Sequence, residues 1–365
     1  MPRVIFPTVD SHPFIAELRQ KVAEYFESRH ISTKANGAMI AKTFILFAVT
    51  LGSYGLILSG RFPPLAMLGL AMLMGVGVAG LGFCVAHDAL HDAYSSSRRL
   101  NRVLGWTFDF LGASSYMWKI LHNVVHHTYT NVHGVDEDLE VSGLLRLSPY
   151  TPRKGIHRFQ HLYCFFAYSL STLNWVFLKD YQYLSRREIG PFDRRVHRKR
   201  DLGALVAWKL FYYAWTIVIP LLVLKLAWWQ FLIGYVAMHL TAGTILGVVF
   251  QLAHVVEDTQ HPLADSEGHM ERAWAVHQMA TTSDFARGSR WLSWYVGGLN
   301  FQVEHHLFPK ICSVHYPAIS GIVREVAAKH GVPYNEHPSL WAAIRSHRET
   351  LKRLGRDAVP APSPA

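Results

Sequence analysis

Four long apolar runs divide this chain of 365 residues, at 39–58, 64–85, 205–224 and 231–252. Each is long enough to cross the roughly 30 Å hydrocarbon core of a bilayer as a helix. The connections within each pair, residues 59–63 and 225–230, are short. The pattern therefore predicts an all-α membrane protein in which four transmembrane helices form two hairpins.

A fifth run, residues 159–178, is apolar but interrupted by polar side chains, among them His161, Ser169, Ser171 and Asn174. Its aromatic density is typical of a membrane interface. If it crossed the membrane, the histidine groups described below would lie on opposite faces and could not share one site. We therefore expect this run to lie on the membrane surface.

Charge is distributed unevenly between these runs and the rest of the chain. Lys and Arg number 36 against 26 Asp and Glu, a net charge of +10, and they gather in the segments before, between and after the hairpins. A basic excess beside apolar runs is the positive-inside pattern, so we expect these segments to face the cytoplasm. The pattern does not favour binding to nucleic acid.

Three distant cysteines, Cys84, Cys164 and Cys312, suggest no disulfide framework and fit a reducing compartment.

We expect one domain with membrane and cytoplasmic parts in alternation. Residues 1–38 form an N-terminal cytoplasmic segment without the apolar core of a secretory signal. Residues 39–85 form the first membrane hairpin, 86–204 a first part of a cytoplasmic cap, 205–252 the second hairpin and 253–358 the rest of the cap. Residues 359–365, rich in Pro, Ala and Ser, are expected to be a loose tail.

Two groups of histidines follow the first hairpin. His87 and His91 come directly after the second apolar run. A spacing of four puts both imidazoles on one face of a helix, as in helices that supply two ligands to one metal ion. In the second group, His122 and His126 share a helix face and His127 is turned by about 100°. Adjacent histidines can therefore serve two different metals.

A third group, Gln302 to His306, follows the second hairpin and ends in the doubled pair His305 and His306. His254 emerges at the end of the fourth apolar run. A single pair of histidines on an interfacial helix is more often structural than ligating. Here the number of membrane spans places three such groups on the same face of the membrane. Their coincidence reverses that expectation and predicts metal binding.

The number of ligands predicts two metals, because seven grouped histidines and His254 exceed what one four- or six-coordinate ion accepts. Imidazole alone does not choose among iron, zinc and copper. Nearby carboxylates could orient the ligating rings: Asp88, Asp92, Asp136, Asp138, Glu257 and Asp258. We interpret the other histidines as surface or packing residues, including His157, His161, His197, His261, His315 and His330.

The strings HDALHDAYS, HNVVHHTYTN and GGLNFQVEHHLFP resemble the three histidine boxes of the membrane fatty acid desaturases. Gln302, which opens the third box, resembles the front-end branch, and the chain is most similar in character to bacterial delta-6 acyl-lipid desaturases without a fused cytochrome domain. The likeness extends from about residue 36 to about residue 334.

This resemblance implies a four-helix membrane stem under a cytoplasmic cap that holds a non-haem diiron centre. It implies O2-dependent removal of two hydrogens from adjacent methylenes of an unsaturated C18-type acyl chain, on a glycerolipid or on coenzyme A, in unsaturated fatty acid biosynthesis. Gln302 occupies a ligand position but is a poor iron donor. The implied metal ligands are His87, His91, His122, His126, His127, His254, Gln302, His305 and His306.

The acyl chain has no hydrogen-bonding handle at the reacting carbons, so a narrow apolar tunnel must position it. Trp118, Trp294 and Leu299 lie near the boxes and could line such a tunnel, although packing is the commoner role.

Many front-end relatives carry a cytochrome b5 domain with an HPGG string, which this sequence lacks. Electrons are therefore expected from an external carrier, ferredoxin or free cytochrome b5, on the basic face.

Two alternatives remain at this point. A fatty acyl hydroxylase would use the same scaffold, although a third box that begins with glutamine argues against it. A membrane metal transporter would place its ligands near the middle of the membrane on broken helices, whereas these histidines lie at or beyond the ends of the apolar runs.

Overall fold

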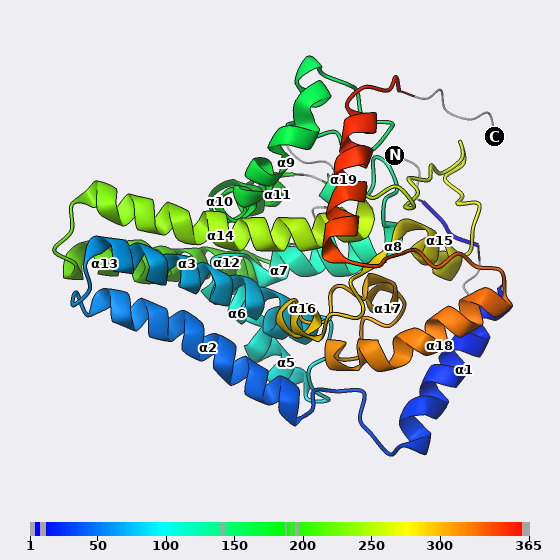
Figure 1. Cartoon of the computed structure of the whole chain (residues 1–365), viewed down its shortest axis with the longest axis horizontal. Coiled ribbons are helices and arrows are strands. Elements are labelled where there is room, and N and C mark those ends of the chain that lie inside the picture. Colours follow the sequence, from blue (N-terminus) through cyan, green and yellow to red (C-terminus); the bar gives the residue numbers. More distant parts are fainter. Residues whose placement is uncertain are drawn as a thin grey trace.

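The computed structural model describes residues 4–7, 12–139, 143–186, 188–190, 192–193 and 197–359. Within them, four helical spans are long and apolar enough to cross a membrane, as predicted: Gly37–Leu58, Pro64–Leu90, Lys199–Val223 and Trp228–His254. They run side by side and form the left half of Figure 1. Of the expected loose tail, residues 360–365 lie outside the described residues.

The spans are longer than the apolar runs at the end where the histidines lie. Helix α3 (Pro64–Leu81) continues through the π-helical turn η2 (Gly82–Ala86) into α4 (His87–Leu90). Helix α14 (Trp228–His254) extends to its last histidine. The first hairpin is completed by α2 (Gly37–Leu58), and the second by α12 (Lys199–Tyr213), η8 (Ala214–Val218) and α13 (Ile219–Val223). His87 and His254 are thus carried on helical extensions of the membrane stem.

Local sequence explains where the first hairpin begins and turns. The Asn36 side chain caps α2 by accepting a hydrogen bond from the N–H of Met39 at 3.0 Å. Gly60, with φ of 64°, allows the tight turn that follows α2. Pro64 then starts α3, at a position where its missing N–H costs nothing.

The fifth apolar run is not one long helix. It is divided into α9 (Gln160–Ser169), α10 (Ser171–Asn174) and η6 (Trp175–Lys179), followed by α11 (Asp180–Ser185). The hydroxyl of Thr172 donates to the carbonyl of His239 on α14 at 2.9 Å, so the segment packs against the second hairpin. The absence of a fifth long apolar helix among the described residues agrees with the expectation that this run does not cross.

The remaining elements are short helices and two small sheets. Strands β1 and β2 pair antiparallel, and β3 and β4 pair parallel. These elements are α1 (Pro13–Ser28), α5 (Arg98–Gly105), α6 (Thr107–Phe110), α7 (Ser115–Trp118), η3 (Lys119–His126), α8 (His127–Tyr129), η4 (Glu137–Leu139), η5 (Gly155–Phe159), β1 (Glu188–Ile189), β2 (Phe192–Asp193), α15 (Trp274–Thr281), β3 (Asp284–Phe285), α16 (Arg290–Tyr295), α17 (Gln302–Leu307), η9 (Ser313–His315), α18 (Tyr316–Lys329), β4 (Glu336–His337) and α19 (Leu340–Leu354).

The third histidine group is held by an apolar core at the right of Figure 1, where α1 and α18 cross below α15 and α17. Phe14 and Leu18 of α1 pack in one cluster with Val323 of α18 and with Val303 and Leu307 of α17, and all are buried. Because Val303 and Leu307 flank His305 and His306, this packing fixes the orientation of both imidazoles.

Candidate metal centre

All three histidine groups and the end of α14 meet in one buried cluster. The ring centroids of His87 and His305 lie 4.5 Å apart, although the two residues belong to opposite ends of the sequence. The rings of His126 and His254 lie 4.7 Å apart, and those of His127 and His306 lie 4.4 Å apart. The histidines predicted to share a site are therefore neighbours.

The cluster divides into two principal sets that could each hold a metal ion. In each set the candidate ligand atoms lie within 4.8 Å of one another, and every residue is buried. A third, overlapping set joins His127 to His305 and His306, so His127 lies between the two. The principal sets are His87, His91, His122 and His305, and His126, His254 and His306.

Seven imidazole nitrogens in this cluster are buried and have no hydrogen-bond partner in the protein. A buried polar atom without a partner costs about 1–3 kcal/mol, so seven together would be a severe burden on the fold. Metal coordination would satisfy them at once, and the donor set fits imidazole-binding transition metals. The atoms are His87 Nδ1, His91 Nε2, His126 Nε2, His127 Nδ1, His254 Nε2, His305 Nε2 and His306 Nε2.

In the set that contains His126, the second nitrogen of each ring is held by the protein. His126 Nδ1 lies 3.1 Å from Asp136 Oδ2. His306 Nδ1 lies 2.8 Å from Gln278 Oε1. His254 Nδ1 lies 3.3 Å from a backbone carbonyl in α15. These partners fix the ring orientations and leave Nε2 of each histidine facing the centre of the set.

The other set is supported by aromatic side chains. His305 Nδ1 lies 3.2 Å from the Tyr316 hydroxyl. Trp118 stacks on His122 with ring centroids 4.3 Å apart, and it meets the rings of His87 and His91 edge-on. These contacts restrict the rings by packing rather than by charge.

Burial determines the charge of the clustered rings. It lowers the pKa of His91, His122, His127, His305 and His306 well below the usual value, so these imidazoles are neutral. A neutral imidazole has a lone pair to donate to a metal.

His126 differs from these rings. Burial disfavours its charged form, but the Asp136 carboxylate outweighs that effect and raises the pKa of His126 above the usual value. The negative charge of Asp136 would also make this ring a stronger donor to a metal.

The helical geometry of the second group is not the one expected from an α-helix. Residues Lys119–His126 form a π-helix, in which residues five apart come close. His122 Nε2 therefore lies 3.2 Å from His127 Nε2. His122 and His126 still stack, with centroids 5.1 Å apart, but they fall in different sets. The expectation that His127 turns away from His122 is wrong because the wider turn brings the two rings together.

Of the six acids expected near the rings, three lie beside clustered histidines. Asp136 contacts His126 directly, and Asp138 Oδ2 lies 4.0 Å from the same ring. Asp88 Oδ1 lies 3.6 Å from His87 Nδ1. Asp88 Oδ2 also accepts hydrogen bonds from Ser313 N and Oγ at 3.0 and 2.8 Å, which ties the first box to the segment after the third.

The other three acids, Asp92, Glu257 and Asp258, do not hydrogen-bond to the clustered rings in the part of the chain that the structure describes. Asp92 instead accepts from Asn101 at 3.4 Å. Glu257 and Asp258 are exposed. The expectation that these acids orient a ring is therefore wrong, because each carboxylate points to the surface or to another partner.

The supports Gln278, Tyr316 and Thr281 were not expected from the sequence, nor was a carboxyl pair behind α17. The Tyr334 hydroxyl lies 2.7 Å from Asp284 Oδ2 and 2.9 Å from Glu304 Oε1. Burial raises the pKa of Glu304 well above its ordinary value and that of Asp284 to about 6. Only the position of Glu304, directly before His305, could have drawn attention to it.

Gln302 opens α17 one turn before His305 and is buried, in keeping with a position at the edge of the cluster. Of the possible tunnel residues, Trp118 contacts the clustered rings, while Leu299 packs in the core and Trp294 lies partly exposed beside Lys42.

The histidines interpreted as surface or packing residues all lie outside the metal-compatible sets. His197 bonds the Tyr116 hydroxyl at 2.6 Å, and His330 bonds Glu17 at 2.8 Å. His157 and His315 bond backbone carbonyls at 3.1 and 2.9 Å.

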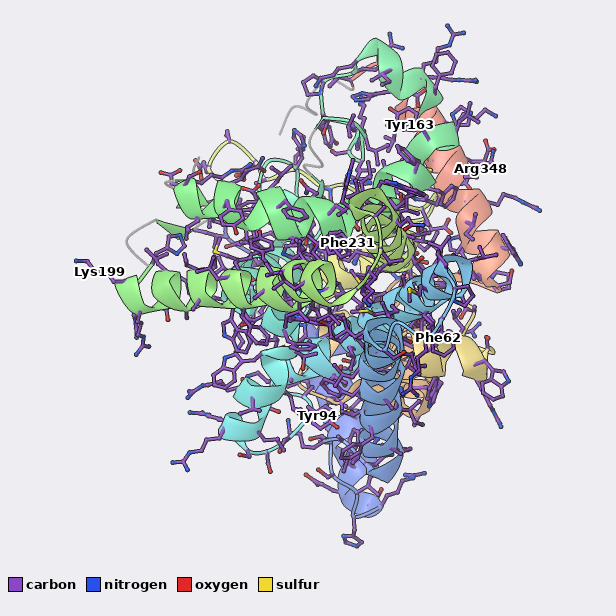
Figure 2. All side chains as sticks on the ribbon, turned by 90° about the vertical axis from the view of Figure 1, so that its left-hand side faces the viewer. Phe62, Tyr94, Tyr163, Lys199, Phe231 and Arg348 are labelled. Carbon is purple, nitrogen blue, oxygen red and sulfur yellow. The ribbon has the colours of Figure 1, made fainter. Side chains whose placement is uncertain are left out.

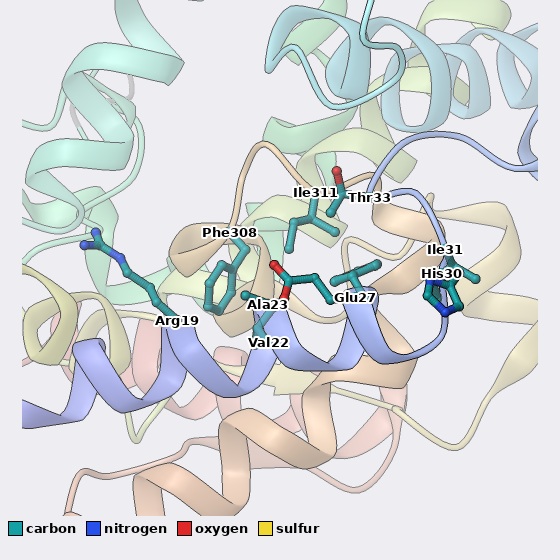
Figure 3. A pocket seen from close by; sticks show the side chains of 10 residues that line it. Arg19, Val22, Ala23, Glu27, His30, Ile31, Thr33, Phe308 and Ile311 are labelled. Carbon is teal, nitrogen blue, oxygen red and sulfur yellow. The ribbon is translucent and has the colours of Figure 1, made fainter.

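One cavity lies away from the cluster. It is an open groove of about 720 Å³ between α1 and the segment after α17 (Figure 3). Val22, Ala23 and Phe26 line one side and Phe308 and Ile311 the other, and none of the clustered histidines faces it. The groove therefore belongs to the outer surface of the third-box segment.

Comparison with known proteins shows what the whole chain is similar to. The family model described as fatty acid desaturase matches residues 63–338. The chain is 35% identical to the sn-1 linoleoyl-lipid 6-desaturase of Synechocystis sp. over 93% of this chain and 94% of that protein. It is 35% identical to the protein of the same name from Arthrospira platensis, over 93% and 92%. It is 34% identical to an acyl-lipid (8-3)-desaturase of Physcomitrium patens, over 96% of this chain and 73% of that protein.

Proposed function

The chain belongs to the fatty acid desaturase family, and on that premise we propose that its buried histidines hold two iron ions and act on acyl chains of membrane glycerolipids. It is an oxidoreductase of fatty acyl chains and a membrane protein with four apolar helices. The observation that carries the proposal is the set of seven buried, unpartnered imidazole nitrogens.

We infer that one metal is held by His87, His91, His122 and His305, and the other by His126, His254 and His306. His127 lies between the two sets and would complete either one. Gln302 is proposed as a weak or indirect ligand at the edge of the site, since an amide oxygen is a poorer iron donor than imidazole. A bound pair of irons would supply the oxygen activation that removal of two hydrogens from adjacent methylenes requires.

The protein's own contribution is placement and exclusion of water. Asp136, Gln278 and Tyr316 hold three of the ligating rings in place before any metal binds. Burial keeps water away from the cluster, which protects a reactive centre from side reactions. Trp118 covers His122 and would restrict how closely an acyl chain can approach that metal.

The substrate class follows from the relatives. The proteins from Synechocystis and Arthrospira are named for a linoleoyl chain at the sn-1 position of a lipid and for position 6. We propose the same class for this chain: a front-end, delta-6-like desaturation of an unsaturated C18 acyl group on a glycerolipid. The third box that begins with Gln302 supports the front-end position.

We infer that the histidine end of the stem faces the cytoplasm, because Lys and Arg gather in the segments at that end. Electrons are proposed to come from a separate acidic carrier, such as ferredoxin or free cytochrome b5. Lys119 supports this inference, since it lies exposed on η3 one turn before His122. A cationic surface above a metal ligand would attract an acidic partner.

The test is product analysis. The chain is expressed in a host that lacks polyunsaturated lipids, the host is fed linoleic acid, and new double bonds are located by mass spectrometry. The expected product is a C18 chain with an added double bond at position 6, recovered from glycerolipid and absent with His126→Ala. A hydroxylated product instead would favour the hydroxylase alternative. Unchanged lipids in the presence of a competent reductant would contradict the proposal.

A further inference from the structure

A second cavity, of about 330 Å³, lies between the two membrane hairpins at the end opposite the histidines. Its walls come mainly from α3 and α14, with Ile57 from the end of α2 and Leu224 directly after α13. In Figure 1 this end is at the far left, and Figure 2 looks onto it, with Phe62 and Phe231 near the middle of the view. The cavity opens among apolar side chains that the membrane stem exposes, such as Leu65 and Ile233.

Four polar side chains that line this cavity have hydrogen-bond partners within the protein. The Gln230 carbonyl oxygen accepts from Ala227 N at 3.0 Å. Thr216 donates to the Tyr212 carbonyl at 2.7 Å, and Tyr54 donates to the carbonyl of Trp215. The Tyr235 hydroxyl lies 3.3 Å from that of Tyr212. The walls are mainly apolar, so a hydrocarbon chain suits them better than a polar ligand or water.

The cavity is closed on the side of the metal centre. A side-chain carbon on Gly75 of α3 would overlap the Met238 carbonyl of α14, so the two helix backbones touch there. Behind this contact, Tyr212 bonds His239 Nε2 at 2.9 Å, and His239 Nδ1 lies 3.1 Å from Thr172. A polar layer thus separates the cavity from the cluster, and the cavity is distinct from the site of desaturation.

Two cations lie in the connections of the hairpins, close in sequence to residues that line the cavity. Arg61 lies in the connection of the first hairpin, between the lining residues Ile57 and Pro64, and Lys225 lies between Leu224 and Leu226 in the second. Both are exposed. No Asp or Glu occurs between residues 28 and 87 or between 202 and 256, so neither hairpin offers them a carboxylate.

We propose that this cavity binds one anionic glycerophospholipid, with an acyl chain between the hairpins and its phosphate between Arg61 and Lys225. The cavity continues the apolar surface that faces the bilayer, so a membrane lipid can enter it sideways. The charge of these two cations complements a phosphate group, and a Lys or Arg near an anionic lipid contributes on the order of a five-fold gain in affinity. The bound lipid would add contacts between the two hairpins at this end of the stem.

The experiment measures lipid retention by the full chain. The protein is purified from nanodiscs of phosphatidylglycerol and phosphatidylcholine, and bound lipid is quantified by native mass spectrometry. Gly234→Leu fills the cavity, because a side chain there meets only Ala71, with the first carbon 3.9 Å from its Cβ. Gly69→Leu is the matched control: it adds the same side chain to α3 at an exposed position with open space around it.

We expect one phosphatidylglycerol per wild-type chain, loss of that lipid with Gly234→Leu, and retention with Gly69→Leu. Arg61→Gln and Lys225→Gln should each weaken retention about five-fold and reduce the preference over phosphatidylcholine. Equal retention by Gly234→Leu and wild type would overturn the proposal. So would no preference for the anionic lipid, or a Gly234→Leu variant that changes only the chain length of the desaturated product, since the cavity would then hold the substrate.

Discussion

The carboxylate of Asp136 holds Nδ1 of His126 at 3.1 Å and also accepts the N–H of Asn131 at 2.9 Å. It therefore links one candidate ligand to the backbone turn that follows the second box. We predict that Asp136→Asn weakens metal binding 10- to 100-fold, because the ring loses both its orientation and the charge that makes it a stronger donor.

Metal retention against a graded series of chelator concentrations measures this effect. Glu257→Gln is the control, since it neutralises an exposed carboxylate without a contact to the cluster. If Asp136→Asn retained metal as tightly as Glu257→Gln, the proposed role of Asp136 would be wrong.

Gln278 is the corresponding support of His306. Its carbonyl oxygen lies 2.8 Å from His306 Nδ1 and accepts from the Thr130 hydroxyl at 2.9 Å. Gln278→Leu should remove the acceptor 2.8 Å from buried His306 Nδ1, at a cost of about 1–3 kcal/mol, whereas the Thr130 hydroxyl keeps the His126 carbonyl at 2.6 Å as its acceptor. Gln278→Glu retains an acceptor and should restore metal content. Iron per chain, measured beside thermal stability, distinguishes the two variants, and equal metal content in both would contradict the assignment.

An ion pair between α1 and α18 predicts a dependence of stability on pH. Hydrogen bonds from Lys329 and His330 lower the pKa of Glu17 from 4.5 to about 2. Its contribution is therefore complete above about pH 4.5 and is lost as the pH falls towards 2. Protection of α1 against hydrogen exchange, relative to the intrinsic rate at each pH, should fall more steeply between pH 4.5 and 2 in the wild type than in Glu17→Gln. Parallel profiles for the two proteins would show that this pair does not hold α1.

Packing of α9 on α14 depends on Gly243. An added methyl group there would overlap the Ser169 carbonyl, so Gly243→Ala should lower the free energy of unfolding by about 1–3 kcal/mol. Gly52→Ala on α2 faces open space and should be neutral or slightly stabilising. Thermal unfolding in one detergent compares the two variants. Equal midpoints would mean that α9 can shift without cost.

The membrane stem and the histidine boxes could be predicted because they depend on local patterns. Apolar runs define helices by length, and the spacing of His87 and His91 places both in one set. The assignment of His122 and His126 to different metal-compatible sets could not be predicted, because it depends on a π-helical turn that no local pattern of residues marks. The apolar runs also ended short of His254, since hydropathy does not report that a helix continues beyond the membrane.

The supports of the rings were harder to predict for a different reason. Six acids lay near the boxes in sequence, but only the turn that follows the second box brings Asp136 to His126. Gln278 reaches His306 from a helix 28 positions earlier in the chain. A single amide in a short helix carries no signal of such a role, because its partner is defined only by tertiary packing.

The number of metal ions per chain tests the central claim most directly. The protein is purified without chelator, and metals are quantified by mass spectrometry beside the protein concentration. We predict two irons per chain in the wild type and in His330→Ala, whose ring bonds Glu17 at the surface, and a clear loss in His126→Ala. One metal per chain, or zinc in place of iron, would contradict the account, as would iron content that does not change in His126→Ala.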